Sequence, residues 1–446
     1  MSTLSAHILQ QLKPFLTARR WLVAYSGGVD SHVLLHLLAH LPAQPNTHAY
    51  PLIEAVHINH QLQAPSAQWA QHCQQQCDSL GLVLHSVAVD VAQGSRRSLE
   101  EQARKARYQV FEALMQPGDV LLMGHHLDDQ VETLMLRMLR GSGSKGMAAM
   151  LQTRALACGQ LTRPLLDTPR AHIEAYAAAH QLAWIEDPSN QQTDFDRNFL
   201  RLQLLPVLAQ RWPQYRQTLA RAAMLSEESA QLNTELAALD FNTLGLSSAS
   251  RSIPLRDIVT LSPARQKNLL RYWLQCRQFA MPSAAQLQAV LTDVIAAQQD
   301  AEPLLEWEGV QIRRFKDKLY AMEPLIEVDI NRVYRWDLMR PLQITGVGSL
   351  SVKATIGEGI STERLKNAVI SVCFRQGGER SQPVGRAHSQ TLKKLLQEHH
   401  IEPWLRHRLP LLYCDGELIA VADLWVCQGW QAAAGEPGYN VCWLRI

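Results

Sequence analysis

The chain has 446 residues, enough for two or three domains, and its 43 basic and 41 acidic residues leave a formal net charge of +2. This balance excludes nucleic-acid binding by overall charge alone, and a hydrophobic content of 47% excludes a disordered chain. No apolar run approaches the roughly 18 residues of a membrane span, the first residues show no secretion signal, and the eight cysteines are too sparse for a disulfide scaffold, so we expect a cytoplasmic protein with reduced thiols.

The first 190 residues alternate short apolar runs with amphipathic stretches. The apolar runs predict strands at 21–25, 52–58, 82–89 and 119–124. The amphipathic stretches predict helices at 31–41, 66–80, 98–115 and 128–140. Apolar strands separated by helices indicate an α/β fold with a parallel sheet buried on both faces, and ligands of such sheets lie at the carboxyl ends of the strands.

The rest of the chain has a different pattern. Apolar residues recur at three- and four-residue spacing in the stretch before about residue 300, which predicts helices, and short strands follow near 304–322. Further on, glycine-punctuated strand patterns flank a predicted helix at 389–399. We therefore predict three domains: an α/β domain at 1–212, a small, mainly helical domain at 213–325 and an α+β domain at 326–446.

The strongest motif follows the first predicted strand and opens a helix. It reads Ser26-Gly27-Gly28-Val29-Asp30-Ser31. Its glycines let the backbone approach a ligand, its N–H groups and the helix N-terminus favour an anion, and its serines add hydroxyl donors. These features predict a phosphate cradle, in which the carboxylate of Asp30 makes sense if Mg²⁺ bridges it to phosphate.

A second glycine pattern is a decoy. Gly141, Gly143 and Gly146 match GxGxxG, but they follow a predicted helix and not a strand, so we reject a dinucleotide-binding loop. We expect a loop near the phosphate site instead, with Arg140 and Lys145 available to phosphate.

A polar constellation follows the fourth predicted strand. It reads Gly124-His125-His126-Leu127-Asp128-Asp129-Gln130-Val131-Glu132-Thr133. On a helix, positions 125, 129 and 132 fall within roughly 60° of one another. Two carboxylates and an imidazole on one face can hold an ammonium group, coordinate Mg²⁺ or accept a proton. The alternative is that the acids only complement the helix N-terminus.

Both motifs carry a family resemblance. The SGGxDS loop resembles that of the PP-loop ATP pyrophosphatases, and with GHHxDDQxET it resembles the tRNA(Ile)-lysidine synthases. Further matches run along most of the chain and are weakest in its middle: His57 to His60, Leu99 to Tyr108, Arg140 to Gly143, Arg163 to Leu166, Glu186 to Asn190, Arg197, Asn198, Arg201, Phe374 to Arg380, Leu392 to Lys394, Pro403 and Trp404.

The resemblance implies a PP-loop catalytic domain and a carbon–nitrogen ligase that uses ATP and Mg²⁺. Such enzymes join L-lysine to C2 of the wobble cytidine, position 34, in the CAU anticodon of tRNA(Ile). The cytidine O2 attacks the α-phosphorus of ATP, pyrophosphate leaves, and the lysine amine then displaces AMP. The lysidine product changes codon specificity from AUG to AUA and tRNA identity from methionine to isoleucine.

The resemblance also implies roles for named residues. The loop Ser26 to Ser31 would bind ATP, with Asp30 positioning Mg²⁺ during adenylation. Asp129 and Glu132 would hold the lysine ammonium, since two carboxylates one helical turn apart can grip a cation. His125 would orient lysine or take its proton, and Asp128 would serve Mg²⁺.

Other residues receive weaker assignments. We expect Arg104 or Arg107 to contact the nucleotide or the leaving pyrophosphate, or else to form a solvated helix face. His57 and His60 either line the nucleotide pocket or hold a strand end. A further group would organise the loop that receives the anticodon: Asp187, Asn190, Arg197 and Asn198.

The predicted third domain has a local basic bias. Seven Lys or Arg stand against three acids between Arg375 and Arg408, and phosphate contacts with this patch would make binding salt-dependent. The family resemblance suggests that the patch contacts the tRNA body. Trp404 either stacks on a base or fills a core. No membrane and no protein partner is expected.

Two other functions remain open. A PP-loop tRNA thiolase would need cysteines near the loop, whereas Cys73 and Cys77 fall on a predicted helix and Cys158 stands alone, so we expect none beside it. Amidotransferase relatives would need a glutaminase portion that the sequence does not show. A non-catalytic tRNA-binding protein would not require the complete set of loop and acidic residues.

Overall fold

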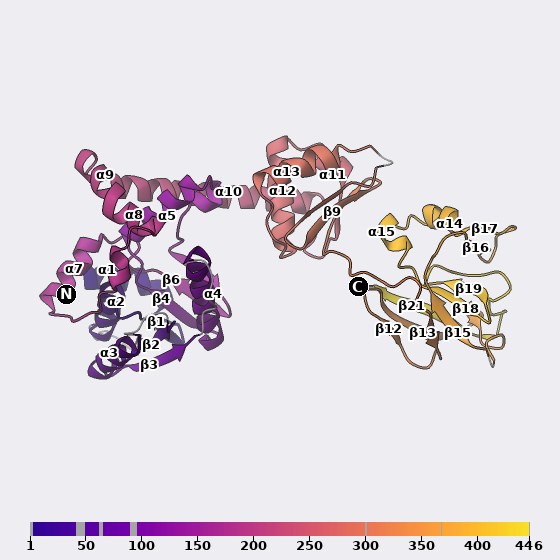
Figure 1. Cartoon of the computed structure of the whole chain (residues 1–446), viewed down its shortest axis with the longest axis horizontal. Helices are drawn as coiled ribbons and strands as arrows, with labels where there is room; N and C mark the ends of the chain where they lie inside the picture. Colours follow the sequence, from indigo (N-terminus) through magenta and orange to yellow (C-terminus); the bar gives the residue numbers. More distant parts are fainter. Residues whose placement is uncertain are drawn as a thin grey trace. The chain divides into compact units, whose positions relative to one another are not determined.

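The computed structural model describes residues 3–41, 50–61, 66–89, 96–298, 301–366 and 368–445. The chain separates into two compact units, Met1–Glu235 and Leu236–Ile446 (Figure 1). The predicted domain boundaries near 212 and 325 stay predictions. Within the described ranges, no helix is long and apolar enough to cross a membrane.

The first unit is built on a six-stranded sheet in the order β3-β2-β1-β4-β6-β5. All neighbouring strands run parallel except the edge strand β5, which pairs antiparallel with β6. The predicted parallel sheet is therefore confirmed, and the sequence patterns missed only its last hairpin. The strands are β1 (Arg20–Ala24), β2 (Leu52–Asn59), β3 (Val83–Ala88), β4 (Asp119–Met123), β5 (Thr153–Leu156) and β6 (Gly159–Thr162).

Helices cover both faces of this sheet (Figure 1). Because side chains alternate along a strand, Trp21 and Val23 of β1 pack into one core while Leu22 packs into the other. The first core includes side chains from α1, α2, α3 and α7, and the second includes Phe111 of α4. These helices are α1 (Thr3–Leu12), α2 (Val29–Ala39), α3 (Ser66–Ser79), α4 (Arg96–Leu114) and α7 (Arg170–Ala179); the side chains of Leu99 to Glu101, in the family-matched stretch of α4, lie outside the described residues.

The central strands β1 and β4 fix where chemistry can occur. They pair in parallel from Arg20↔Asp119 to Ala24↔Met123, so the segments that follow them leave the sheet side by side. At the amino ends of these strands, the Arg20 guanidinium donates hydrogen bonds to Asp119 and Glu54 at 2.6 Å each. These bonds link β1, β4 and β2 near their first residues.

The first unit has further elements before and after the strands described above. A short 3-10 helix, η1 (Lys13–Phe15), precedes β1. The later elements are α5 (Leu127–Leu139), α6 (Ser144–Met147), η2 (Pro188–Gln191), α8 (Asp196–Phe199), the π-helix η3 (Leu200–Leu204), α9 (Leu205–Arg211) and the first part of α10 (Tyr215–Thr243). The GxGxxG pattern follows α5, a helix, which agrees with its rejection as a dinucleotide loop.

The second unit holds a helical part and an all-antiparallel part. Helices α11 (Leu255–Ile258), α12 (Pro263–Cys276), α13 (Ala284–Ala289) and η4 (Val290–Ile295) share a core with the sheet β7-β10-β9-β8. These strands are β7 (Ser252–Pro254), β8 (Leu304–Trp307), β9 (Val310–Phe315) and β10 (Lys318–Met322).

The C-terminal part has a five-stranded, a four-stranded and a two-stranded antiparallel sheet, and α14 (Leu392–Glu398) shares a core with the two larger sheets, which matches the predicted α+β pattern. The ring of Trp404, on α15 (Pro403–Arg406), meets those of Phe315 and Tyr320 edge-on, at centroid distances of 6.2 and 5.3 Å. The ring is partly buried by these contacts, and whether it also stacks on a base stays a prediction. The strands are β11 (Tyr334–Trp336), β12 (Leu342–Ile344), β13 (Gly348–Ile356), β14 (Ile360–Ser361), β15 (Ile370–Cys373), β16 (Arg380–Ser381), β17 (Gln390–Thr391), β18 (Leu411–Cys414), β19 (Glu417–Val421), β20 (Trp425–Val426) and β21 (Pro437–Arg445).

A histidine cluster on α2 and α7 predicts acid sensitivity of the first unit. Burial, and then the neighbouring His40 and His180, lower the pKa of His36 to about 4. A depressed histidine pKa stabilises the fold above the unfolded pKa of about 6.5, and the contribution is lost as pH falls towards 4. We expect the urea-unfolding midpoint to fall over this range and to fall less in His36→Asn.

The matched control is His7→Gln, which removes a half-exposed histidine that pairs with Asp167 on the surface. The control should keep the wild-type pH dependence. Equal pH dependence in His36→Asn and wild type would contradict this account of the cluster.

Candidate active site

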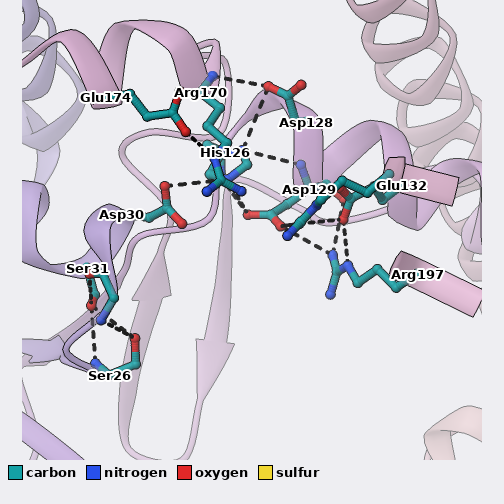
Figure 2. A network of polar contacts seen from close by, with 12 residues as sticks. Ser26, Asp30, Ser31, His126, Asp128, Asp129, Glu132, Arg170, Glu174 and Arg197 are labelled. Carbon is teal, nitrogen blue, oxygen red and sulfur yellow. Dashed lines mark hydrogen bonds and ion pairs between the residues drawn. The ribbon is translucent and has the colours of Figure 1, made fainter. Parts of the chain in front are cut away.

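The phosphate loop lies between β1 and α2, as predicted. Its two hydroxyls face each other, with Ser26 Oγ 3.1 Å from Ser31 Oγ, and the Ser31 hydroxyl donates to the Gly28 carbonyl at 3.0 Å (Figure 2). Gly28 is the N-cap of α2 and brings no capping side chain. The first N–H groups of α2 are therefore left for an anionic ligand.

Gly27 explains the shape of the loop. Its φ is +85°, and a Cβ there would come within 2.7 Å of Ile185 Cδ1 and 3.0 Å of Cys73 Sγ. The expectation that no cysteine lies beside the loop is thus wrong, because α3 packs Cys73 directly behind it. The thiol is nevertheless fully buried, and burial followed by Cys77 raises its pKa to about 12. It is protonated at neutral pH and is a poor nucleophile.

The loop and the second motif meet through a close backbone approach. Gly124 directly follows β4, and a Cβ at this position would lie 3.0 Å from the carbonyl carbon and oxygen of Asp30. Only glycine leaves room for this contact with the first turn of α2. The carboxylate of Asp30 consequently lies beside His126 of the second motif.

His126 bridges the two motifs and is the residue that sequence reasoning missed. Its side chain is 1% exposed, and Nε2 lies 3.6 Å from Asp30 Oδ1 and 3.4 Å from Asp129 Oδ2 (Figure 2). It is also the N-cap of α5 and forms a capping box with Asp129: each side chain accepts the other residue's backbone N–H. Asp129 therefore also stabilises the N-terminus of α5, which is the alternative that the sequence left open.

Charge in this cluster is set by burial and close carboxylates. Burial alone would lower the pKa of His126, but Asp30, Asp129 and Asp128 outweigh it and raise the pKa above its ordinary value. For Asp129, burial would raise the pKa, but His126 and Arg197 outweigh it and lower the pKa to about 2. Asp129 is therefore ionised at all physiological pH values.

Glu132 is bound by two arginines. Its side chain is fully buried, and the Nε groups of Arg197 and Arg201 donate to its two oxygens at 2.7 Å each. Arg201 adds a second bond at 3.0 Å. With its carboxylate occupied, Glu132 is poorly placed to grip an incoming ammonium. The geometry favours a positioning role in which Glu132 orients the two guanidinium groups, which also approach Asp129 Oδ1 at 3.5 Å.

Asp128 points away from the phosphate loop. One oxygen pairs with Arg216 and the other accepts the backbone N–H of Arg170 at 3.1 Å. Both oxygens are engaged, so the geometry disfavours the expected Mg²⁺ role of Asp128. Asp30 fits that role better, since its Oδ1 is buried and makes no hydrogen bond with the described residues.

His125 lies between two cavities. The first, of about 200 Å³, extends from the phosphate loop over the ends of β1, β2 and β4, and Arg107 and Asp129 also line it. The Nδ1 of His125 is buried and without a hydrogen-bond partner in the described part of the chain. Burial, together with Arg163 and Arg197, outweighs the opposing effect of Asp129 and lowers the pKa of His125 to about 3. The imidazole is thus neutral at physiological pH, and it is a weak base.

The second cavity, of about 460 Å³, is rich in arginine. His125 and Thr133 line it together with Arg104, Arg137, Arg140 and Arg197, and with the acids Asp194 and Asp196. The predicted pair Arg104 and Arg107 is thus divided, one residue to each cavity. An excess of guanidinium groups suits an anionic ligand.

The weaker assignments resolve into supporting contacts. His57 is buried, and its Nδ1 lies 3.0 Å from the Tyr25 carbonyl, so it holds a strand end. His60 Nε2 lies 3.4 Å from Arg107. Asp187 accepts the Ser189 N–H, and the Asn198 amide donates to the carbonyls of Ser189 and Gln192. These contacts organise the 187–192 loop, whereas Arg197 binds Glu132, and the predicted role of the loop in receiving the anticodon stays a prediction.

Three family descriptions match successive parts of the chain. Residues 1–208 match the PP-loop domain, residues 254–320 the TilS substrate binding domain, and residues 370–443 the TilS substrate C-terminal domain. Together these matches cover both units.

Curated relatives match nearly the whole chain. A tRNA(Ile)-lysidine synthase from Serratia proteamaculans (strain 568) is 42% identical over 450 residues, covering 99% of both chains. Another from Coxiella burnetii (strain RSA 493 / Nine Mile phase I) is 40% identical over 420 residues, covering 94% of this chain and 92% of the relative. Among solved structures, the U34-tRNA thiolase NcsA from Methanococcus maripaludis is 18% identical with a TM-score of 0.41, covering 50% of this chain and 78% of that one.

The buried Glu132 pairing predicts a large loss of stability in Glu132→Gln. This change leaves the shape of the side chain but removes the charge that binds Arg197 and Arg201. Breaking a buried pair typically costs about 3 kcal/mol, and somewhat less where the arginines are part-exposed. Urea unfolding of the first unit should show it.

The matched control is Glu174→Gln, which removes the carboxylate of a surface pair with Arg170. Exposed pairs contribute less than about 1 kcal/mol, so the control should change stability little. Equal losses in the two variants would refute the positioning role of Glu132.

Proposed function

The chain belongs to the tRNA(Ile)-lysidine synthase family, and from this premise we propose that the two cavities beside His125 carry out its reaction. The ligase joins L-lysine to C2 of cytidine 34 in the CAU anticodon of tRNA(Ile), using ATP and releasing AMP and pyrophosphate. The observation that carries the proposal is the contact of His126 with both Asp30 and Asp129, because it places the phosphate loop next to an ionised carboxylate.

ATP would occupy the first cavity. The N–H groups and hydroxyls of Ser26 to Ser31 would bind its phosphates, and Arg107 lines the same cavity. No group of three or more His, Cys, Asp or Glu in the described ranges could hold a metal alone, so Mg²⁺ would bind Asp30 together with phosphate oxygens. Bound there, Mg²⁺ would neutralise charge on the phosphates.

Lysine would bind where Asp129 and Arg197 meet. Asp129 is ionised and lines the first cavity, which suits the side-chain ammonium, whereas Arg197 lines the second and suits a carboxylate. The amine must lose a proton before it attacks C2. His125 lines both cavities, and its buried Nδ1 is our candidate to orient the amine, because an imidazole with a pKa of about 3 is too weak a base to take the proton.

The tRNA would contact both units. In the first, the arginines of the second cavity provide positive charge near the target cytidine. In the second, Lys393 and Lys394 are exposed on α14 within the basic stretch 375–408. We propose that this stretch binds the tRNA body and that the enzyme acts in the cytoplasm. Sulfur transfer is not favoured, since the thiol behind the loop is buried and protonated.

Asp129→Asn should raise the KM for lysine by about tenfold or more, because a charge-assisted hydrogen bond to the ammonium is lost. Asparagine can still accept the N–H of His126, so the helix start is preserved. The KM for ATP should change far less. Steady-state kinetics with each substrate varied in turn would measure both values.

Asp167→Asn is the control for this measurement, because it removes an exposed carboxylate that pairs with His7 outside the two cavities. It should leave both constants as in wild type. Equal increases in the two KM values of Asp129→Asn would show that the ammonium assignment is incorrect.

Reversing the charge of Lys393 and Lys394 to glutamate should weaken tRNA binding and make it less salt-dependent, while ATP binding stays intact. Filter binding at several salt concentrations would measure the affinity. Lys353 and Lys366, exposed in the same unit but outside residues 375–408, form a matched control when both are changed to glutamate. An unchanged tRNA affinity in the Lys393/Lys394 variant, or an equal loss in the control, would argue against the patch.

A further inference from the structure

An apolar groove lies where α9 ends and α10 begins. Figure 1 labels these two helices. Its volume is about 730 Å³, and Met135, Leu208 and Leu219 line it together with Trp212 and Arg211. Trp212 is 59% exposed. A single exposed apolar side chain is common on protein surfaces, but this ring stands beside an apolar groove and so extends a contiguous apolar surface.

The backbone holds Trp212 in place. Its N–H donates to the Leu208 carbonyl at 2.8 Å, and its carbonyl accepts the Tyr215 N–H at 2.9 Å. Pro213 stiffens the turn between the two helices. Beneath the groove, Met135 and Tyr215 belong to a buried cluster. The ring is therefore presented on a rigid support, which lowers the entropy cost of binding a flat partner.

Arg211 lines this groove, and the segment that forms much of it is rich in arginine. Residues 197–221 contain five arginines and no acid, in a chain whose net charge is only +2. Three of these arginines are anchored on the carboxylates of α5: Arg197 and Arg201 on Glu132, and Arg216 on Asp128. Arg211 and Arg221 are exposed. An aromatic ring among arginines is the combination that binds single-stranded nucleic acid.

The groove lies further along α5 than the candidate active site and shares no lining residue with its two cavities. Met135 lies seven residues after Asp128 on α5, which places it on the same face of the helix, about 10 Å further along the axis. Arg216 closes the gap by pairing with Asp128. A nucleotide next to one held at His125 is therefore within reach of the groove.

We propose that the groove holds an unpaired base of the tRNA anticodon loop close to the target cytidine, with Trp212 stacked on the base and Arg211 near its phosphate. The proposal rests on the proposed function, since it requires tRNA as substrate. A second copy of the chain fits less well, because a two-fold interface on this surface would set like-charged arginines against each other.

The test compares Trp212→Ala with Trp212→Phe in the full-length enzyme. Stacking on an aromatic ring typically supports roughly a 5- to 100-fold change in affinity. Trp212→Ala should raise the KM for tRNA within that range and leave the KM values for ATP and lysine unchanged. Trp212→Phe, which keeps a flat ring, should restore most of the loss.

A matched control is Val207→Ala, which truncates another exposed apolar residue, on α9 but outside the groove lining. It should behave as wild type. The wild-type enzyme is assayed for lysidine formation in the same experiment, which tests the proposed function by itself. If the wild type forms lysidine and Trp212→Ala keeps the wild-type KM for tRNA, only the groove proposal fails.

Transcripts that lack a single base at one anticodon-loop position identify the partner. At the stacked position, removing the base should cost wild type as much as Trp212→Ala does, and the two changes together should cost no more than either alone. Additive losses at every position would overturn the proposal. So would an unchanged tRNA KM in Trp212→Ala, or a change in oligomeric state in place of a change in tRNA KM.

Discussion

The rest of the site depends on one close contact, between the end of β4 and the first turn of α2. Because Gly124 has no side chain, the backbone of Asp30 can lie against it, and His126 two residues later reaches both Asp30 and Asp129. The parallel pairing of β1 with β4 makes this contact possible, since it releases both segments at the same edge of the sheet. A reaction that first activates a base with ATP and then adds an amine needs two such sites in contact.

The charges of the site are distributed so that each group has a separate task. Asp129 is ionised and lines the first cavity, Glu132 is buried against two arginines, and His125 is kept neutral by burial and nearby guanidinium groups. An ammonium and a carboxylate can therefore both be accommodated beside a neutral imidazole. Three arginines neutralise the carboxylates of α5, and the exposed Arg211 and Arg221 leave positive charge on the nearby surface, which suits a phosphate backbone.

Much of the fold and part of the site could be predicted from the sequence. The strand and helix pattern, the phosphate loop and the motif after β4 depend on local periodicity and on glycine, which a single sequence displays. The state of Glu132 does not, because its partners Arg197 and Arg201 lie 65 and 69 residues further along the chain. A helical face shows which side chains point together, but not what covers them. For the same reason, Cys73 was expected to lie away from the loop that it packs against. His126 received no role from the sequence, although Asp128 and Asp129, two and three residues after it, signalled acidic partners.

The most direct test of the account is a single reaction followed by nucleoside mass spectrometry. Unmodified tRNA(Ile) with a CAU anticodon would be incubated with the protein, Mg²⁺, ATP and isotopically labelled lysine. The account predicts a labelled lysidine nucleoside that disappears when ATP or lysine is omitted. AMP and pyrophosphate without a labelled nucleoside would keep the adenylation step but contradict lysine as the acceptor, and the absence of both would contradict an active ligase.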